Sequence, residues 1–118
     1  FEMEDNFKRR ILILWTSGEK ETALNMVFMY GLNSKLKGWW DEVTLLVWGA
    51  STKLLGTDPE IQERLKALQD AGVETIACKA CANNLGLVEK LESLDVQVFF
   101  TGEYLSKRIQ AGDHVLSV

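Results

Sequence analysis

The chain has 118 residues, of which 47% are hydrophobic, a length and composition typical of a single domain with one core. The formal net charge of -4 and the scattered basic residues argue against nucleic acid as a partner. No apolar run approaches the roughly 18 residues that a membrane span needs, so we expect no membrane partner either.

Residues 1–8 are expected to be a tail or a remnant of expression, and residues 9–118 a single α/β domain. The first six residues are acidic and aperiodic, and they lack the basic flank and apolar run of a signal peptide. The chain has two cysteines, too few for a disulfide scaffold, and their Cys-x-x-Cys spacing suggests a reducing compartment. We therefore expect a cytoplasmic protein.

The first half of the chain alternates between strand and helix patterns. Residues 9–15 contain five successive apolar side chains, at 11–15, as in a strand that is buried on both faces. Residues 21–36 carry apolar side chains at helical spacing, and residues 43–48 repeat the strand pattern. Residues 59–71 then predict a helix, with Asp58 as its N-cap and a proline at its first position.

The second half continues the alternation. Strands are predicted at 73–78, 96–100 and 114–118, and helices at 84–94 and 102–111. Five strands alternating with four helices imply right-handed crossovers and a mainly parallel five-stranded sheet. The predicted fold is a three-layer α/β/α sandwich.

Ligands and reactive groups of such sheets gather beyond the carboxyl ends of the strands, where loops meet helix N-termini. At that rim we expect to find the candidate substrate-binding residues Thr16, Ser17, Gly18, Gly49, Lys79, Thr101, Gly102 and Glu103. The candidate catalytic residues, Cys78 and Cys81, belong to a loop after the third strand.

The two cysteines are the best candidates for chemistry. A helix N-terminus and the neighbouring Lys79 can lower the pKa of a thiol and populate the reactive thiolate. Such a thiol can carry sulfur as a persulfide or cycle with its partner through a disulfide. The alternative is that both cysteines are inert core residues, since cysteine is often buried. Two thiolates are too few for a zinc site, so we expect no metal, and no cofactor is predicted.

Other polar candidates give weaker signals. Residues 16–18 could hold an anion with their backbone N–H groups, but no phosphate-loop pattern is present. His114, the only histidine, opens the last strand, whereas the cysteines close the third, so a Cys–His dyad within one subunit is not expected. Glu103 and Tyr104 could face the thiols or belong to a solvated helical turn. Four tryptophans in a small domain suggest that a partner covers some of them.

Several segments resemble the DsrE/DsrF-like family, which includes sulfur-relay subunits. They are the end of the first strand at 15–18, the turn at 47–49, the segment 72–87 around Cys-Lys-Ala-Cys, and the closing segment 111–116. The resemblance implies a flavodoxin-like three-layer fold, a homo-oligomer that is a trimer or hexamer, and a sulfur-donor or acceptor protein as partner. In sulfur-relay members a cysteine carries a persulfide eight residues before the glycine matched here by Gly86, which points to Cys78; other members have a cysteine where Cys81 stands.

Three functions remain open at this point. The first is a sulfur carrier or sulfurtransferase-like protein in which Cys78 takes up sulfane sulfur and Cys81 assists or resolves. The second is a dithiol redox protein. The third is a non-catalytic oligomeric module whose rim binds a small ligand.

Overall fold

The structure, a computed structural model, describes residues 9–118; residues 1–8, for which we expected a tail, lie outside the described residues. Within residues 9–118, five strands form one sheet in the order β4-β3-β2-β1-β5, and every neighbouring pair is parallel. The strands are β1 (Arg10–Trp15), β2 (Glu42–Val47), β3 (Glu74–Cys78), β4 (Gln97–Phe99) and β5 (His114–Ser117). The expected parallel sheet is confirmed.

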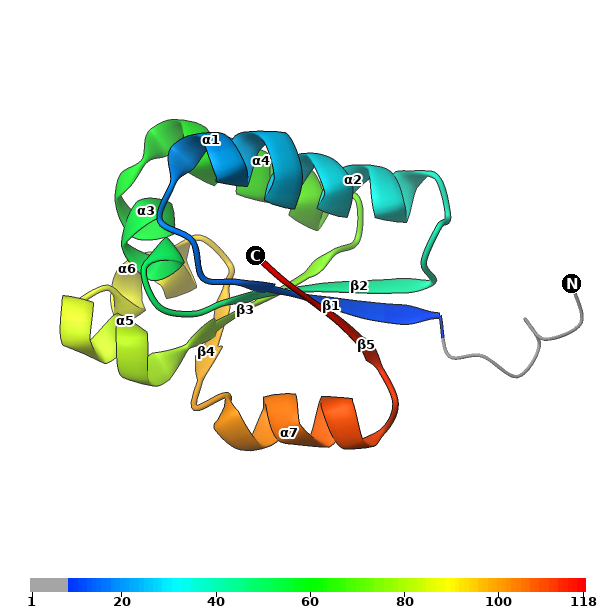
Figure 1. Ribbon diagram of the computed structural model, residues 1–118. Coiled ribbons are helices and arrows are strands. Elements are labelled where there is room, and N and C mark those ends of the chain that lie inside the picture. Colours follow the sequence, from blue (N-terminus) through cyan, green and yellow to red (C-terminus); the bar gives the residue numbers. More distant parts are fainter. Residues whose placement is uncertain (1–8) are drawn as a thin grey trace, which may run out of the picture.

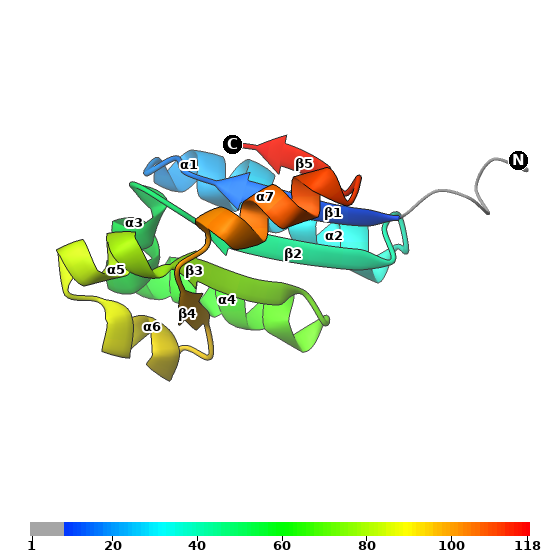
Figure 2. The ribbon, with the colours of Figure 1, turned by 90° about the horizontal axis from the view of Figure 1, so that it is seen from below.

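Helices lie on both faces of this sheet, as the alternation of elements predicts (Figure 1). The helices are α1 (Lys20–Thr22), η2 (Ala23–Phe28), α2 (Met29–Leu36), α3 (Ser51–Thr57), α4 (Pro59–Asp70), α5 (Lys79–Leu85), α6 (Val88–Ser93) and α7 (Gly102–Gln110). In Figure 1, α1, α2 and α4 lie above the sheet and α7 lies below it; Figure 2 shows α7 crossing the opposite face.

The position of α7 follows from the strand order. From β1 to β4 the chain adds strands in one direction, and it then returns to place β5 on the other side of β1. Because parallel crossovers are right-handed, this reversal moves the last connecting helix to the opposite face. The α/β/α sandwich is therefore confirmed.

Alternate residues of each strand face two separate cores. Ile13 and Trp15 of β1 and Leu45 of β2 pack into the larger core beneath α2 and α4. Leu12 and Leu46 belong to a smaller core on the α7 face, together with partly buried aromatic side chains. The period of two along each strand puts consecutive residues on opposite faces. Hence most side chains of these strands are apolar on both faces, as is typical of a sheet with helices on each side.

One helix was not predicted. Residues 51–57, for which the sequence predicts no helix or strand, form α3. The sequence there is rich in small residues and no side chain caps the helix start, so neither periodicity nor a capping motif indicates a helix. Its Leu55 is fully buried, and Gly56 lets the helix approach Leu87, whose side chain would lie 2.7 Å from an added Cβ. Packing, not local preference, stabilises α3.

The predicted helix over 84–94 is wrong in its bounds. The chain forms α5 and α6 there, separated at Gly86, which has the left-handed φ of +66°. A glycine adopts this conformation at little cost and ends helices for that reason. At its other end α5 begins at Lys79, five residues before the predicted start, so the cysteine motif runs directly from a strand into a helix.

The first long helix is confirmed over most of its predicted length. Residues 20–36 are helical without interruption, but residues 23–28 form a π-helix. Within residues 9–118, no helix combines the length and the apolar character that a membrane crossing requires.

Candidate functional site

Cys78 occupies the junction between β3 and α5. It is the last residue of β3, where it pairs with Phe99 of β4, and it is also the N-cap residue of α5. The residue is buried, with a relative exposure of 4%. The sequence predicted a loop for this motif, and that prediction is wrong. The sheet fixes the backbone of Cys78, and N–H groups of the first turn of α5 face its sulfur.

Hydrogen-bond donors shift the pKa of the Cys78 thiol. Burial raises this pKa, but the backbone N–H of Cys81, the Thr101 side chain, the N–H of Ala80 and the Cys81 side chain together outweigh it, and the net direction is down. None of these N–H groups closes an ordinary capping hydrogen bond to the sulfur. They belong nevertheless to the second and third residues of the helix, the positions that an N-cap side chain engages. Their dipoles favour the thiolate over the thiol.

Cys81 lies in the first turn of α5 and has the opposite tendency. Burial raises the pKa of its thiol, the Gly49 N–H lowers it, and the charge and sulfur of Cys78 raise it further; the net direction is up. The Gly49 N–H donates to Cys81 Sγ at 3.3 Å. Both cysteines are free thiols, and each shifts the pKa of the other. The arrangement therefore favours a Cys78 thiolate that accepts a hydrogen bond from a Cys81 thiol.

The other predicted rim residues divide into two groups. Thr101 is buried beside Cys78, whereas Gly102 and Glu103 are exposed at the start of α7, where Glu103 pairs with Lys107 at 2.9 Å. Glu103 is thus part of a solvated helical turn. Lys79, expected beside the sulfurs, places its ammonium 5.6 Å from the centre of the Phe100 ring, a cation–π distance.

The Thr16–Gly18 segment lies at the same end of the sheet but uses two of its N–H groups internally. The N–H groups of Thr16 and Ser17 both donate to the Val118 carbonyl, at 2.7 and 3.2 Å. Gly18 approaches Ala50 closely, since an added Cβ would lie 3.2 Å from the Ala50 Cβ. A pocket of about 360 Å³ adjoins this contact, lined by Gly18, Ala50, Lys53, Leu54 and Thr57.

His114 lies away from the thiols, as its position in the sequence implies. It opens β5, which pairs with β1, and two strands separate β5 from β3. Its ring contacts the ring of Trp40, with the centres 5.1 Å apart. Among residues 9–118 there is no group of three or more His, Cys, Asp or Glu side chains that could hold a metal ion.

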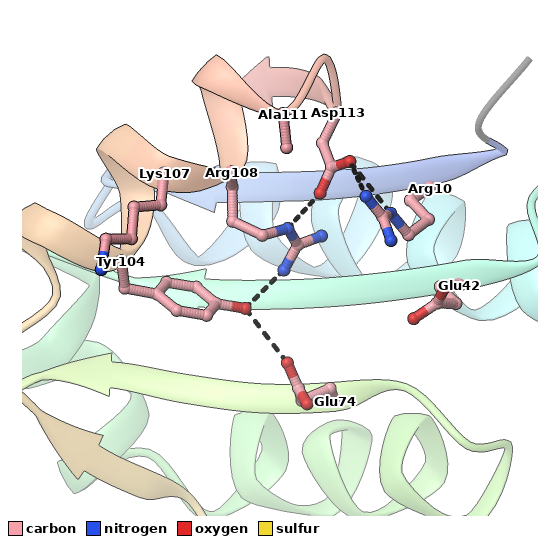
Figure 3. Close-up of a pocket in the computed structure, with 8 residues that line it drawn as sticks. All are labelled: Arg10, Glu42, Glu74, Tyr104, Lys107, Arg108, Ala111 and Asp113. Atoms are coloured by element: carbon pink, nitrogen blue, oxygen red, sulfur yellow. Dashed lines mark hydrogen bonds and ion pairs between the residues drawn. The ribbon is translucent and has the colours of Figure 1, made fainter.

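A second polar cluster, absent from the sequence analysis, lies on the α7 face near the amino ends of the strands (Figure 3). There Asp113 Oδ1 accepts from Arg10 at 2.6 and 2.9 Å, and Oδ2 accepts from Arg108. Arg108 also donates to the Tyr104 hydroxyl, which donates to Glu74 Oε1 at 3.2 Å. These residues border a pocket of about 360 Å³. No motif could have indicated the cluster, because its members come from three separate elements and one turn.

Sequence reasoning also missed Ala80, because its N–H matters only if α5 begins at Lys79. The available signal was Gly86, a glycine that ends a helix and so places the cysteines in the helix before it.

Comparison with known proteins identifies relatives of this chain. No curated protein matched it. Among solved structures, it is similar to the conserved protein of unknown function BT1422 from Bacteroides thetaiotaomicron, with 34% identity, a TM-score of 0.92 and coverage of 98% of both chains. It also resembles MTH1491, a protein of unknown function from Methanobacterium thermoautotrophicum, with 17% identity, a TM-score of 0.71 and coverage of 92% of this chain and 98% of the other.

A third similar structure is the ychN protein from E. coli, with 17% identity, a TM-score of 0.69 and coverage of 95% of this chain and 100% of the other. At this identity the last two structures support the fold alone. The model of the DsrE/DsrF-like family matches residues 11–118, which include every strand and helix after the first residue of β1. The chain therefore belongs to the DsrE/DsrF-like family.

Proposed function

We propose that this protein is a sulfur carrier in which Cys78 takes up sulfane sulfur as a persulfide and Cys81 assists or resolves. The observation that carries the proposal is the environment of Cys78. Its buried sulfur faces two backbone N–H groups at the start of α5 and the Thr101 side chain at the start of α7, and these donors lower its pKa. A thiolate is the nucleophile of sulfur transfer, so this cysteine suits the role better than Cys81, whose pKa is raised.

Loading is a nucleophilic displacement. The Cys78 thiolate attacks a terminal sulfane sulfur of an inorganic polysulfide, a new S–S bond forms, and the old S–S bond breaks. The electron pair leaves with the polysulfide, which is now one sulfur shorter. In transfer, the thiolate of an acceptor attacks the outer sulfur and Cys78 leaves as a thiolate. The donors around Cys78 stabilise the thiolate in both steps.

Cys81 can divert this cycle. If Cys81 attacked the inner sulfur of the persulfide, a disulfide would form, hydrosulfide would leave, and the proton of Cys81 would leave with it or pass to solvent. Two features oppose that reaction. The Gly49 N–H holds Cys81 Sγ at 3.3 Å, and the raised pKa keeps Cys81 protonated. A protonated thiol is a poor nucleophile.

Dithiol redox activity is the second candidate, and one observation favours it. Cys78 and Cys81 lie near each other at the start of α5, where each thiol shifts the pKa of the other, and two neighbouring thiols can be oxidised to a disulfide. In that case an oxidant would remove two electrons and two protons from the pair.

We further propose a homo-oligomer, a trimer or hexamer, that exchanges sulfur with a donor or acceptor protein in the cytoplasm. Trp39 is 49% exposed, Phe100 65% and Met29 52%, and large apolar side chains of this kind favour association. The two free cysteines are compatible with a reducing compartment.

Intact mass spectrometry tests these functions. The reduced protein is incubated with one equivalent of inorganic polysulfide, and the product is measured without reductant. A sulfur carrier gains the mass of one sulfur atom, a dithiol redox protein loses two hydrogens, and a non-catalytic module shows no change. The heat-unfolded chain is the control, since its thiols lack the environment of α5. Equal loading of folded and unfolded chain would contradict the proposal.

A further inference from the structure

We infer that Thr101 is a positioning residue for Cys78, with its hydroxyl donating a hydrogen bond to the Cys78 thiolate and, after loading, to the same inner sulfur. The role in sulfur transfer rests on the proposed function. The hydrogen bond itself does not, because it can be measured on the unloaded thiol.

The register of the sheet brings the two residues together. Cys78 of β3 pairs directly with Phe99 of β4. Thr101 follows Phe99 by two residues and is the N-cap residue of α7, just as Cys78 is the N-cap residue of α5. Two neighbouring parallel strands thus end side by side, and each delivers its capping residue to the same edge.

The Thr101 side chain does not serve its own helix. A threonine at an N-cap ordinarily accepts a hydrogen bond from the first turn, but Thr101 makes no such bond to α7. The residue is 1% exposed, and its Oγ1 has no hydrogen-bond partner of ordinary geometry. A buried hydroxyl without a partner is costly, so its orientation calls for an explanation.

The Cys78 sulfur supplies that explanation. The Thr101 side chain is buried at the strand end next to Cys78 and is one of the groups that lower the pKa of this thiol. A hydroxyl can rotate, so it can accept from the thiol and donate to the thiolate. The bond to the thiolate is charge-assisted and therefore the stronger of the two. Thr101 thus stabilises the charged form of Cys78.

A consequence follows for sulfur transfer. When an acceptor takes the outer sulfur, Cys78 is the leaving group, and a thiol of lower pKa leaves faster. A hydrogen bond to the inner sulfur therefore favours attack on the outer sulfur over attack on the inner one. Thr101 would in this way direct the persulfide toward delivery.

The test measures the pH dependence of Cys78 alkylation by iodoacetamide in a Cys81→Ser background, in which Cys78 is the single thiol. Thr101→Val removes the hydroxyl and keeps the shape. We expect its pH profile to move to higher pH, with alkylation at pH 7 slowed roughly tenfold, the effect of one hydrogen bond to a charged group. Thr101→Ser restores the hydroxyl and is expected to restore the profile of the parent.

Thr52→Val is the matched control, because Thr52 is also fully buried and its Oγ1 also lacks a hydrogen-bond partner, but it belongs to α3. Its profile should equal that of the parent. Thr101→Ala provides a second hydroxyl deletion if Thr101→Val folds poorly. An unmoved profile in the folded Thr101 deletion variants, or an equal displacement in Thr52→Val, would overturn the inference.

Polysulfide loading separates this inference from the proposed function. A displaced alkylation profile without sulfur loading of the parent would leave the Thr101 hydrogen bond standing and reject the carrier. If the parent gains sulfur but the alkylation profile of the Thr101 variants does not move, the carrier function stands and the Thr101 hydrogen bond is rejected.

Discussion

Replacing Asp113 with asparagine should destabilise the fold more than any exposed substitution on α7. The Asp113 side chain is fully buried, and its two oxygens accept hydrogen bonds from Arg10 and Arg108 (Figure 3). Asparagine keeps the volume of the side chain but removes its charge, and its NH2 group then faces one of the two guanidinium groups, donor against donor. The hydrogen bonds to that arginine, either Arg10 of β1 or Arg108 of α7, are lost, and those to the other arginine are no longer charge-assisted on the acceptor side.

The magnitude follows from the surroundings of the charges. Removing one partner of a buried ion pair costs about 3–5 kcal/mol. Here the side chains of Arg10 and Arg108 retain 32% and 17% exposure, so both guanidinium groups can regain some hydration. We therefore take the lower end, about 3 kcal/mol, which corresponds to a fall in thermal midpoint of roughly 12 °C for a domain of this size.

The difference in unfolding free energy between the parent and Asp113→Asn should also depend on pH. Burial raises the pKa of Asp113, but the hydrogen bonds and charges of the two arginines outweigh burial, and the folded-state pKa is lowered. The carboxylate therefore contributes its full stabilisation above the unfolded pKa of about 3.9 and loses it as the pH falls toward the folded value. The gap between the parent and Asp113→Asn should be constant near neutrality and narrow below about pH 4.

Urea unfolding at several pH values, followed by tryptophan fluorescence, measures both effects. Glu103→Gln on α7 is the control, because its partner Lys107 is 70% exposed and such pairs contribute little. A midpoint for Asp113→Asn equal to that of the control, or a gap that persists unchanged into acid, would refute the reasoning.

Three further predictions concern the rest of the domain. Gly86→Ala should destabilise the fold by about 1 kcal/mol, because alanine is strained at a φ of +66° although it has space there; chemical denaturation measures the loss, and unchanged stability would contradict the assignment of Gly86 as a helix end. Leu12→Ala should cost about 2–5 kcal/mol by opening the smaller core, and a loss below 1 kcal/mol would mean that α7 packs loosely. Light scattering at micromolar concentration should give the mass of a trimer or hexamer, whereas the mass of a monomer would reject the proposed assembly.

Much of the architecture could be predicted because its signals are local. Largely apolar runs, such as those within 9–15 and 43–48, are typical of strands covered on both faces, and they correspond to β1 and β2. Asp58 and the proline after it mark the start of α4, where Asp58 accepts from two backbone N–H groups. Such capping motifs need no tertiary context.

The remaining features depend on contacts between distant residues. The helix α3 forms because Leu55 is buried and Gly56 packs against Leu87, and residues 51–57 by themselves show no periodicity that would indicate it. The sequence located the cysteine motif at the end of β3, but it could not predict the groups that surround the two sulfurs. The N–H of Gly49 and the hydroxyl of Thr101 come from other strand ends. The Asp113 cluster likewise joins residues about a hundred positions apart.

Single-cysteine variants test the central claim most directly, namely that Cys78 and not Cys81 carries the sulfur. Each variant is reduced, incubated with one equivalent of inorganic polysulfide and weighed intact, with thermal midpoints confirming that both are folded. Because the donors around Cys78 favour its thiolate and the pKa of Cys81 is raised, we expect Cys78→Ser to gain no sulfur. We expect Cys81→Ser to gain one sulfur and to keep it longer than the parent, since the competing disulfide can no longer form. Loading that is lost in Cys81→Ser and retained in Cys78→Ser would contradict the account and assign the carrier role to Cys81.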